Sequence, residues 1–141
     1  MVLVTFQREH EDILVDGSKT QTIRRNARRW CSLAHQPDMT GNILEDDVMQ
    51  LYNRSGNVLH IHLGNPRNRA PWCRRLGVST AGWSVTLMRG EAFDDGVAAR
   101  DGFAGRQELL KALMELNGMT MNEVLDHVWA VIAWDWGEGP A

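Results

Sequence analysis

The chain has 141 residues, of which 43% are hydrophobic and 23% are charged, and its formal net charge is −3. These values fit one globular domain over residues 1–141. No run approaches the roughly 18 apolar residues of a membrane span. The acids from Glu9 onward are unlike a secretory signal, and two cysteines cannot build a disulfide framework. We therefore expect a cytoplasmic, reduced protein.

The N-terminal third predicts strands and helices in alternation. Residues 2–6 form a β-branched run that predicts a strand. Residues 9–15 have apolar side chains at helical spacing, and Gly17 follows as a helix terminator. Residues 20–25 are strand-like, with alternating faces. Residues 26–46 predict either an irregular connection or a short helix.

The middle of the chain predicts several short strands. Residues 48–52 and 58–63 are strand-like and are joined by a turn at 53–56. A further strand is expected to begin near Cys73, and residues 83–88 are another strong strand candidate.

The C-terminal part predicts helices and one closing strand. Residues 94–100 begin with an aspartate, which can cap a short helix. Residues 107–116 carry a leucine stripe at helical spacing, and Thr120 with Glu123 has the spacing of a capping box. Residues 128–136 are aromatic and β-branched. The order of elements favours an α+β fold with flanking helices around a mostly antiparallel, barrel-like sheet.

The charges are segregated along the chain. Residues 17–37 have a charge of +5 and residues 48–90 a charge of +6, and neither stretch contains an acid. Such stretches can form a basic surface that binds phosphate, because binding responds to the local field. The alternative is that these arginines line solvated loops and strand edges.

The segment 17–25 concentrates reactive side chains. A turn delivers Lys19 just before a strand on which Thr20, Thr22 and Arg24 share one face, while Ile23 points the other way. The chain has 13 arginines and only two lysines. A desolvated lysine can lose its proton near neutral pH, whereas arginine cannot. The alternative is an ordinary surface lysine on a turn.

Residues 17–24, Gly-Ser-Lys-Thr-Gln-Thr-Ile-Arg, resemble the G-x-K-x-x-T-[IL]-R motif of the ASCH superfamily, whose domains have a PUA-like β-barrel. Further similarity lies in Phe6 with the helix at 9–15, in residues 48–52 and 73–77, and in the C-terminal part from residue 99. The resemblance covers nearly the whole chain. It implies a single PUA-like domain that binds a nucleotide or RNA.

Some members of this superfamily remove the acetyl group from N4-acetylcytidine. The resemblance then implies that Lys19 is the base, Thr22 the nucleophile and Asp101 the assisting acid. Aspartate stands where these members have glutamate, so its reach is one methylene shorter. Lys19 and Thr22 are three residues apart and would face opposite ways on one strand. The mechanism therefore requires Lys19 to lie on the turn before the strand.

Other residues are expected to bind the substrate. Arg24 can polarise the acyl oxygen or hold a phosphate or carboxylate. An aromatic ring beside arginines can stack on a base, which favours Trp72 over Trp30, while the C-terminal tryptophans are expected in the core. The expected substrate-binding residues are Thr20, Arg24, Arg25, Tyr52, Trp72 and Arg74.

Other functions remain open. His60 with His62, and Cys31 with His35, have spacings that metal sites use, but nothing completes the four ligands of a structural zinc site, so neither a metal nor a cofactor is expected. The alternative to an amidohydrolase is an RNA-binding module with a basic cleft, with or without ribonuclease activity. The expected ligand is a nucleoside or RNA, and the chain can be a monomer or a dimer.

Overall fold

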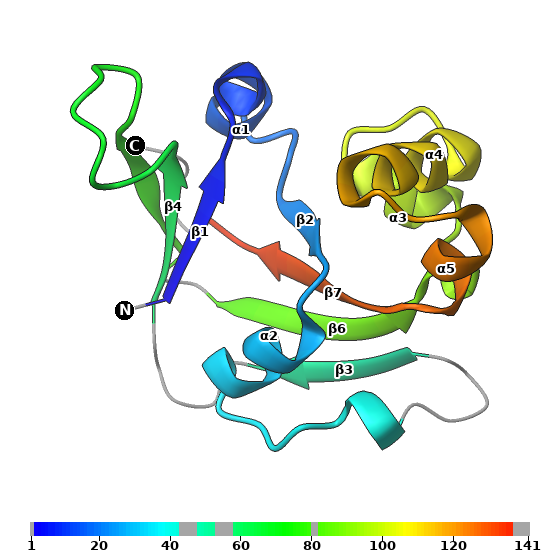
Figure 1. Ribbon diagram of the computed structural model, residues 1–141. Coiled ribbons are helices and arrows are strands. Elements are labelled where there is room, and N and C mark those ends of the chain that lie inside the picture. The colour runs from blue at the N-terminus through cyan, green and yellow to red at the C-terminus, as the bar shows by residue number, and fades with distance from the viewer. Residues whose placement is uncertain (1, 43–47, 53–57, 80–81, 137–141) are drawn as a thin grey trace.

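The computed structural model describes residues 2–42, 48–52, 58–79 and 82–136, without the side chains of residues 42 and 52. It has an α+β fold in which the strands form two sheets (Figure 1). The first sheet has the order β1-β4-β5 and the second the order β2-β7-β6-β3. The strands are β1 (Val2–Phe6), β2 (Gln21–Arg24), β3 (Val48–Tyr52), β4 (Leu59–Leu63), β5 (Arg75–Ser79), β6 (Trp83–Arg89) and β7 (Val128–Trp134).

The sheets are mostly antiparallel, as the sequence predicts. Strand β1 runs parallel to β4, whereas the other pairings among the described strands are antiparallel. Within the described residues the two sheets are not closed into one, so a barrel is not shown. No helix within the described residues has the length and apolar character that crossing a membrane requires.

Five α-helices are described, and three of them gather beside one end of β6 and β7 (Figure 1). They are α1 (Glu11–Val15), α2 (Ala27–Leu33), α3 (Asp95–Arg100), α4 (Arg106–Asn117) and α5 (Met121–Asp126). The predicted helix at 9–15 is divided into a 3-10 turn, Arg8–His10, followed by α1. The region 26–46 contains the short helix α2, whose Asn26 side chain caps it by accepting from the amide of Arg29 at 3.1 Å.

The predicted caps form. Asp94 accepts from the amide of Val97 at 2.8 Å and begins α3. Thr120 and Glu123 form both hydrogen bonds of a capping box at α5. Gly118 ends α4 with a φ of 61°, in the left-handed region that glycine adopts without strain.

The two predicted strands at 48–52 and 58–63 form, but they do not pair with each other. Strand β3 pairs with β6, while β4 lies between β1 and β5 in the other sheet. The predicted turn at 53–56 lies outside the described residues. The strand expected near Cys73 begins at Arg75, and the closing strand ends at Trp134.

Both faces of β6 and β7 are buried, each in a different core. Val85, Leu87 and Ile132 belong to a core that the second sheet shares with the first sheet and α2. Met88 and Trp129 belong to the core under α3, α4 and α5. Strand β2 pairs with β7 at the junction of these cores, so the side chains of β2 reach the space between the first sheet and the helices.

Candidate active site

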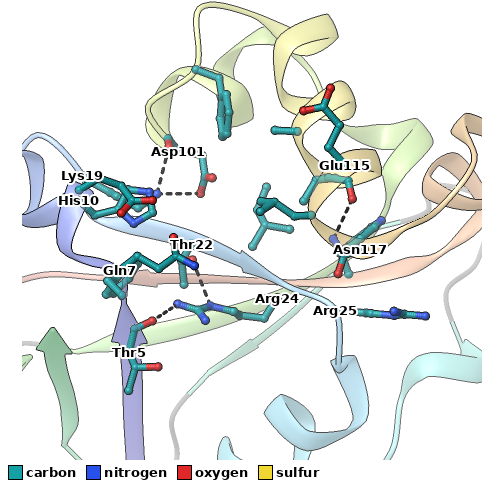
Figure 2. A pocket seen from close by; sticks show the side chains of 18 residues that line it. Thr5, Gln7, His10, Lys19, Thr22, Arg24, Arg25, Asp101, Glu115 and Asn117 are labelled. Carbon is teal, nitrogen blue, oxygen red and sulfur yellow. Dashed lines mark hydrogen bonds and ion pairs between the residues drawn. The ribbon is translucent and has the colours of Figure 1, made fainter. Parts of the chain in front are cut away.

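A cavity of about 610 Å³ opens beside β2, between the end of β1 and helix α4 (Figure 2). One side of it is polar and the α4 side is largely apolar. The polar lining includes Gln7, His10, Lys19, Thr22, Arg24, Arg25 and Asp101, and the apolar lining includes Phe6, Ile23, Phe103, Ala112, Leu113 and Leu116. The three predicted catalytic residues therefore line one cavity.

Lys19 lies on the turn between α1 and β2, as the resemblance requires. Gly17 has a φ of 82°, and the Ser18 amide donates to Asp16 Oδ1 at 2.8 Å. The Lys19 amide then donates to the carbonyl of Ile13 at 2.8 Å. Because β2 begins only at Gln21, the strand alternation that would separate Lys19 from Thr22 does not apply.

The Lys19 ammonium meets the C-terminal end of α3 (Figure 2). Its Nζ donates to the backbone carbonyl of Asp101 at 3.0 Å and lies 3.6 Å from the carboxylate oxygen Oδ1. The two side chains are 5% and 9% exposed. Gln21 fixes this junction, because its Nε2 donates to the carbonyl of Val97 at 3.1 Å and approaches Asp101 Oδ1 at 3.5 Å.

Burial pushes the pKa values of this pair toward each other. Burial lowers the pKa of Lys19, although the charge of Asp101 opposes the change. Burial also raises the pKa of Asp101 from 3.8 to about 6, against the opposing effect of Lys19. Both changes favour the uncharged forms, so the pair holds its charges less firmly than it would in water.

Arg24 holds the hydroxyl of Thr22. Its Nε donates to Thr22 Oγ1 at 3.2 Å, and its Nη2 donates to the carbonyl of Thr5 at 2.6 Å. Thr22 is buried, at 6% exposure. Since the guanidinium occupies an acceptor position of the hydroxyl oxygen, the hydroxyl hydrogen is left to be donated elsewhere.

Phe6 lies between the two cations at the end of β1. Lys19 Nζ is 5.9 Å and the Arg24 guanidinium carbon 5.1 Å from the centre of its ring. A ring face attracts such cations, which helps to keep both in the dry cavity. Sequence reasoning did not assign Phe6 to the site, although it is the last inward residue of the predicted first strand.

His10 packs edge-on against Phe6, with ring centres 6.1 Å apart. Its Nδ1 is buried and has no hydrogen-bond partner within the described part of the chain. Burial lowers the pKa of His10, and the nearby Lys19 and Arg24 lower it further. His10 is thus a neutral group of the cavity wall. Neither His10 nor Gln21 carries a local sequence signal that distinguishes it as a site residue.

The expected substrate-binding residues are divided in space. Arg24 and Arg25 line the cavity with the catalytic candidates, whereas Thr20 is not among the lining residues. Trp72 lies in a neighbouring hollow that also includes Arg24. Tyr52 ends β3, and its side chain lies outside what the structure describes.

Arg74 does not line a described cavity and instead pairs with Glu11 at 3.0 Å. Trp30, the weaker stacking candidate, is 5% exposed and packs edge-on against Trp83, with ring centres 6.4 Å apart. The arginine-rich stretches are free of acids in sequence but not in space, since Arg28 also has an acidic partner, Asp38, at 3.1 Å.

The histidines and cysteines do not assemble a metal site in the described residues, where no group of three or more His, Cys, Asp or Glu side chains could hold an ion. The Nδ1 of His62 instead lies 3.1 Å from the carbonyl of Gly64. Comparison of the chain with protein-family models, curated proteins and solved structures finds no match.

Proposed function

We propose that the chain is a cytoplasmic ASCH-type domain with a PUA-like barrel, and that it hydrolyses the N4-acyl amide of N4-acetylcytidine or a related acylated cytidine. One observation carries the proposal. The buried Lys19 lines the same cavity as Thr22. Its Nζ lies 3.0 Å from the backbone carbonyl oxygen and 3.6 Å from the carboxylate oxygen Oδ1 of Asp101. The core common to both sheets supports the barrel.

The reaction begins with the Lys19–Asp101 pair in its uncharged form. The neutral amine of Lys19 takes the proton of the Thr22 hydroxyl, and Thr22 Oγ1 attacks the acyl carbonyl carbon. The tetrahedral intermediate then breaks the bond to the N4 nitrogen, which takes a proton from the Lys19 ammonium and leaves as the amine of cytidine. Water, activated by the same amine, hydrolyses the threonine ester and releases the acid. The net reaction converts one amide and one water molecule to one carboxylic acid and one amine.

Arg24 has a supporting role in this scheme. Its charge lies against Thr22 Oγ1, where negative charge develops as the proton leaves. A cation at that position stabilises the developing charge at no cost of reorganisation, since Thr5 already holds the guanidinium.

The aspartate at position 101 is compatible with the role of the family's glutamate. The end of α3 brings the backbone of Asp101 to Lys19, and the carboxylate remains within ion-pair distance despite its shorter side chain. The carboxyl group, with its pKa raised to about 6, can exchange a proton with the amine near neutral pH.

The test is to incubate the pure protein with N4-acetylcytidine and to follow the formation of cytidine and acetate. Lys19→Arg keeps the charge but removes a usable base, so kcat should fall by roughly 10²- to 10⁴-fold. Thr22→Val removes the nucleophile and should abolish turnover. Lys111→Arg, at the other lysine, which is exposed on α4, is the matched control and should leave the rate unchanged. Full activity of the Lys19→Arg protein would refute the assigned base.

A second candidate function is RNA binding, with or without cleavage. The wall of the cavity continues through Arg24 and Arg25 into a hollow of about 270 Å³ that Arg29 and Trp30 also line. An arginine-lined path beside the cavity suits a phosphate backbone. If this function holds, affinity for RNA falls steeply with added salt, and fragments of a labelled RNA separate cleavage from binding. A flat salt response contradicts it.

A further inference from the structure

A second hollow, of about 720 Å³, adjoins the candidate active site. The two share the wall formed by Thr5, Phe6, Gln7, Glu9 and Arg24. Beyond this wall the second hollow is lined by Arg8 and by the loop after β4, from which Gly64 and Trp72 contribute. The two hollows therefore lie next to each other, with Arg24 in the lining of both.

Trp72 packs closely against Gly64 in the second hollow. A Cβ atom at Gly64 would lie 2.9 Å from the ring atoms Cζ3 and Cη2 of Trp72 and 2.5 Å from the Cys73 Sγ. Gly64 also has a φ of 65° and donates its amide to the carbonyl of Phe6 at 2.8 Å. The absence of a side chain there lets one edge of the indole pack on the backbone of Gly64, just after the end of β4.

The indole remains partly exposed and lines the hollow. A flat aromatic ring of this kind is a platform on which a nucleic-acid base stacks, and such stacking tolerates any base. Its packing against Gly64 restricts the positions open to the ring, which lowers the conformational entropy that binding would cost.

The charges between the two hollows suit a phosphate. Arg24 belongs to both hollows, and Arg8 lines the second one. Arg67 and Arg69 are exposed on the loop that carries Trp72. Glu9 is the acid on the shared wall, and it is outnumbered by these cations. A phosphodiester that joins a base in the catalytic cavity to its neighbour would pass this cationic region.

We infer that the hollow at Trp72 binds the nucleoside next to the acylated cytidine, so that a strand of RNA of two or more nucleotides is a better substrate than the free nucleoside. This inference rests on the proposed function for the base in the first cavity. It adds Trp72 as the residue that distinguishes a strand from a nucleoside.

The experiment compares N4-acetylcytidine with two dinucleotides that carry a uridine on its 5′ or its 3′ side. At least one dinucleotide should have a kcat/KM higher by roughly 5- to 150-fold, the range expected for stacking of one base on an aromatic ring. Trp72→Ala should lower kcat/KM for that dinucleotide by about the same factor relative to kcat/KM for the nucleoside, and Trp72→Phe should keep most of the gain. Equal rates on all three substrates, or an equal loss on all three in Trp72→Ala, would overturn the inference.

Binding of the same dinucleotides without the acetyl group, followed by calorimetry, separates this inference from the proposed function. Binding that depends on Trp72, in a protein that releases no acetate, would support the subsite and refute the hydrolase. Hydrolysis of the nucleoside, together with dinucleotide binding no tighter than that of cytidine, would support the hydrolase and refute the subsite.

Discussion

Asp101→Asn should change how the stability of the protein depends on pH. The carboxyl group is 9% exposed, and its pKa is raised from 3.8 to about 6, chiefly by burial. The folded state therefore binds this proton more tightly than the unfolded state does. The resulting stability is fully present below pH 3.8 and is lost as the pH rises through about 6.

The size of this loss follows from the two pKa values. At about 1.36 kcal/mol per pKa unit, the rise from 3.8 to about 6 corresponds to roughly 3 kcal/mol. Asparagine has no proton to lose, so its variant lacks this term. Between pH 4 and 7, the free energy of unfolding of the wild type should fall by about 2 to 3 kcal/mol relative to Asp101→Asn.

Urea unfolding of both proteins at each pH measures this difference, because the other acids titrate in both and cancel. Glu115→Gln removes an exposed acid from the α4 side of the same cavity, and it should give a curve parallel to the wild type. If the curves of the wild type and Asp101→Asn are also parallel from pH 4 to 7, the carboxyl group is not held in a dry environment. The proton transfer assigned to it then loses its basis.

Three further outcomes are expected. Thr22→Ser keeps a hydroxyl for Arg24 to hold, so it should retain measurable deacylation where Thr22→Val has none, as product formation will show. Gly64→Ala places a Cβ against Cys73 and Trp72 and should lower the melting temperature far more than Gly17→Ala, which also has a positive φ but meets nothing within 4 Å. His10→Phe should lose less stability than the wild type as the pH falls below 6.5 in thermal unfolding, because the lowered pKa of His10 makes its protonation unfavourable in the folded state; parallel melting temperatures of the two proteins from pH 7 to pH 5 would contradict the neutral assignment.

Features that depend on neighbours in sequence were predictable. Asp94 and the Thr120–Glu123 pair act on amides within a few residues, and each caps the helix expected of it. Lys19 belongs to the same class, since its place on the turn follows from Gly17.

Features that depend on distant partners were not predictable in this way. Strands β3 and β4 are neighbours in sequence and bury side chains in the same core, yet they pair with distant strands in different sheets. Phe6 contacts Lys19 and Arg24 only because the end of β1 lies beside them, and His10 joins this group by packing against Phe6. Part of the charge of the basic stretches is neutralised by acids from other parts of the sequence, since Arg28 pairs with Asp38 and Arg74 with Glu11.

The long-range pairing of β2 determines when the site can exist during synthesis. Gln21 pairs with Ala133 and Arg24 with Ala130, so the strand that carries Thr22 has its sheet partner only when β7 has been made. Such non-local contacts require closure of a long loop and form late. A nascent chain that stops before residue 128 thus has the motif but lacks the strand that holds Thr22 in the sheet.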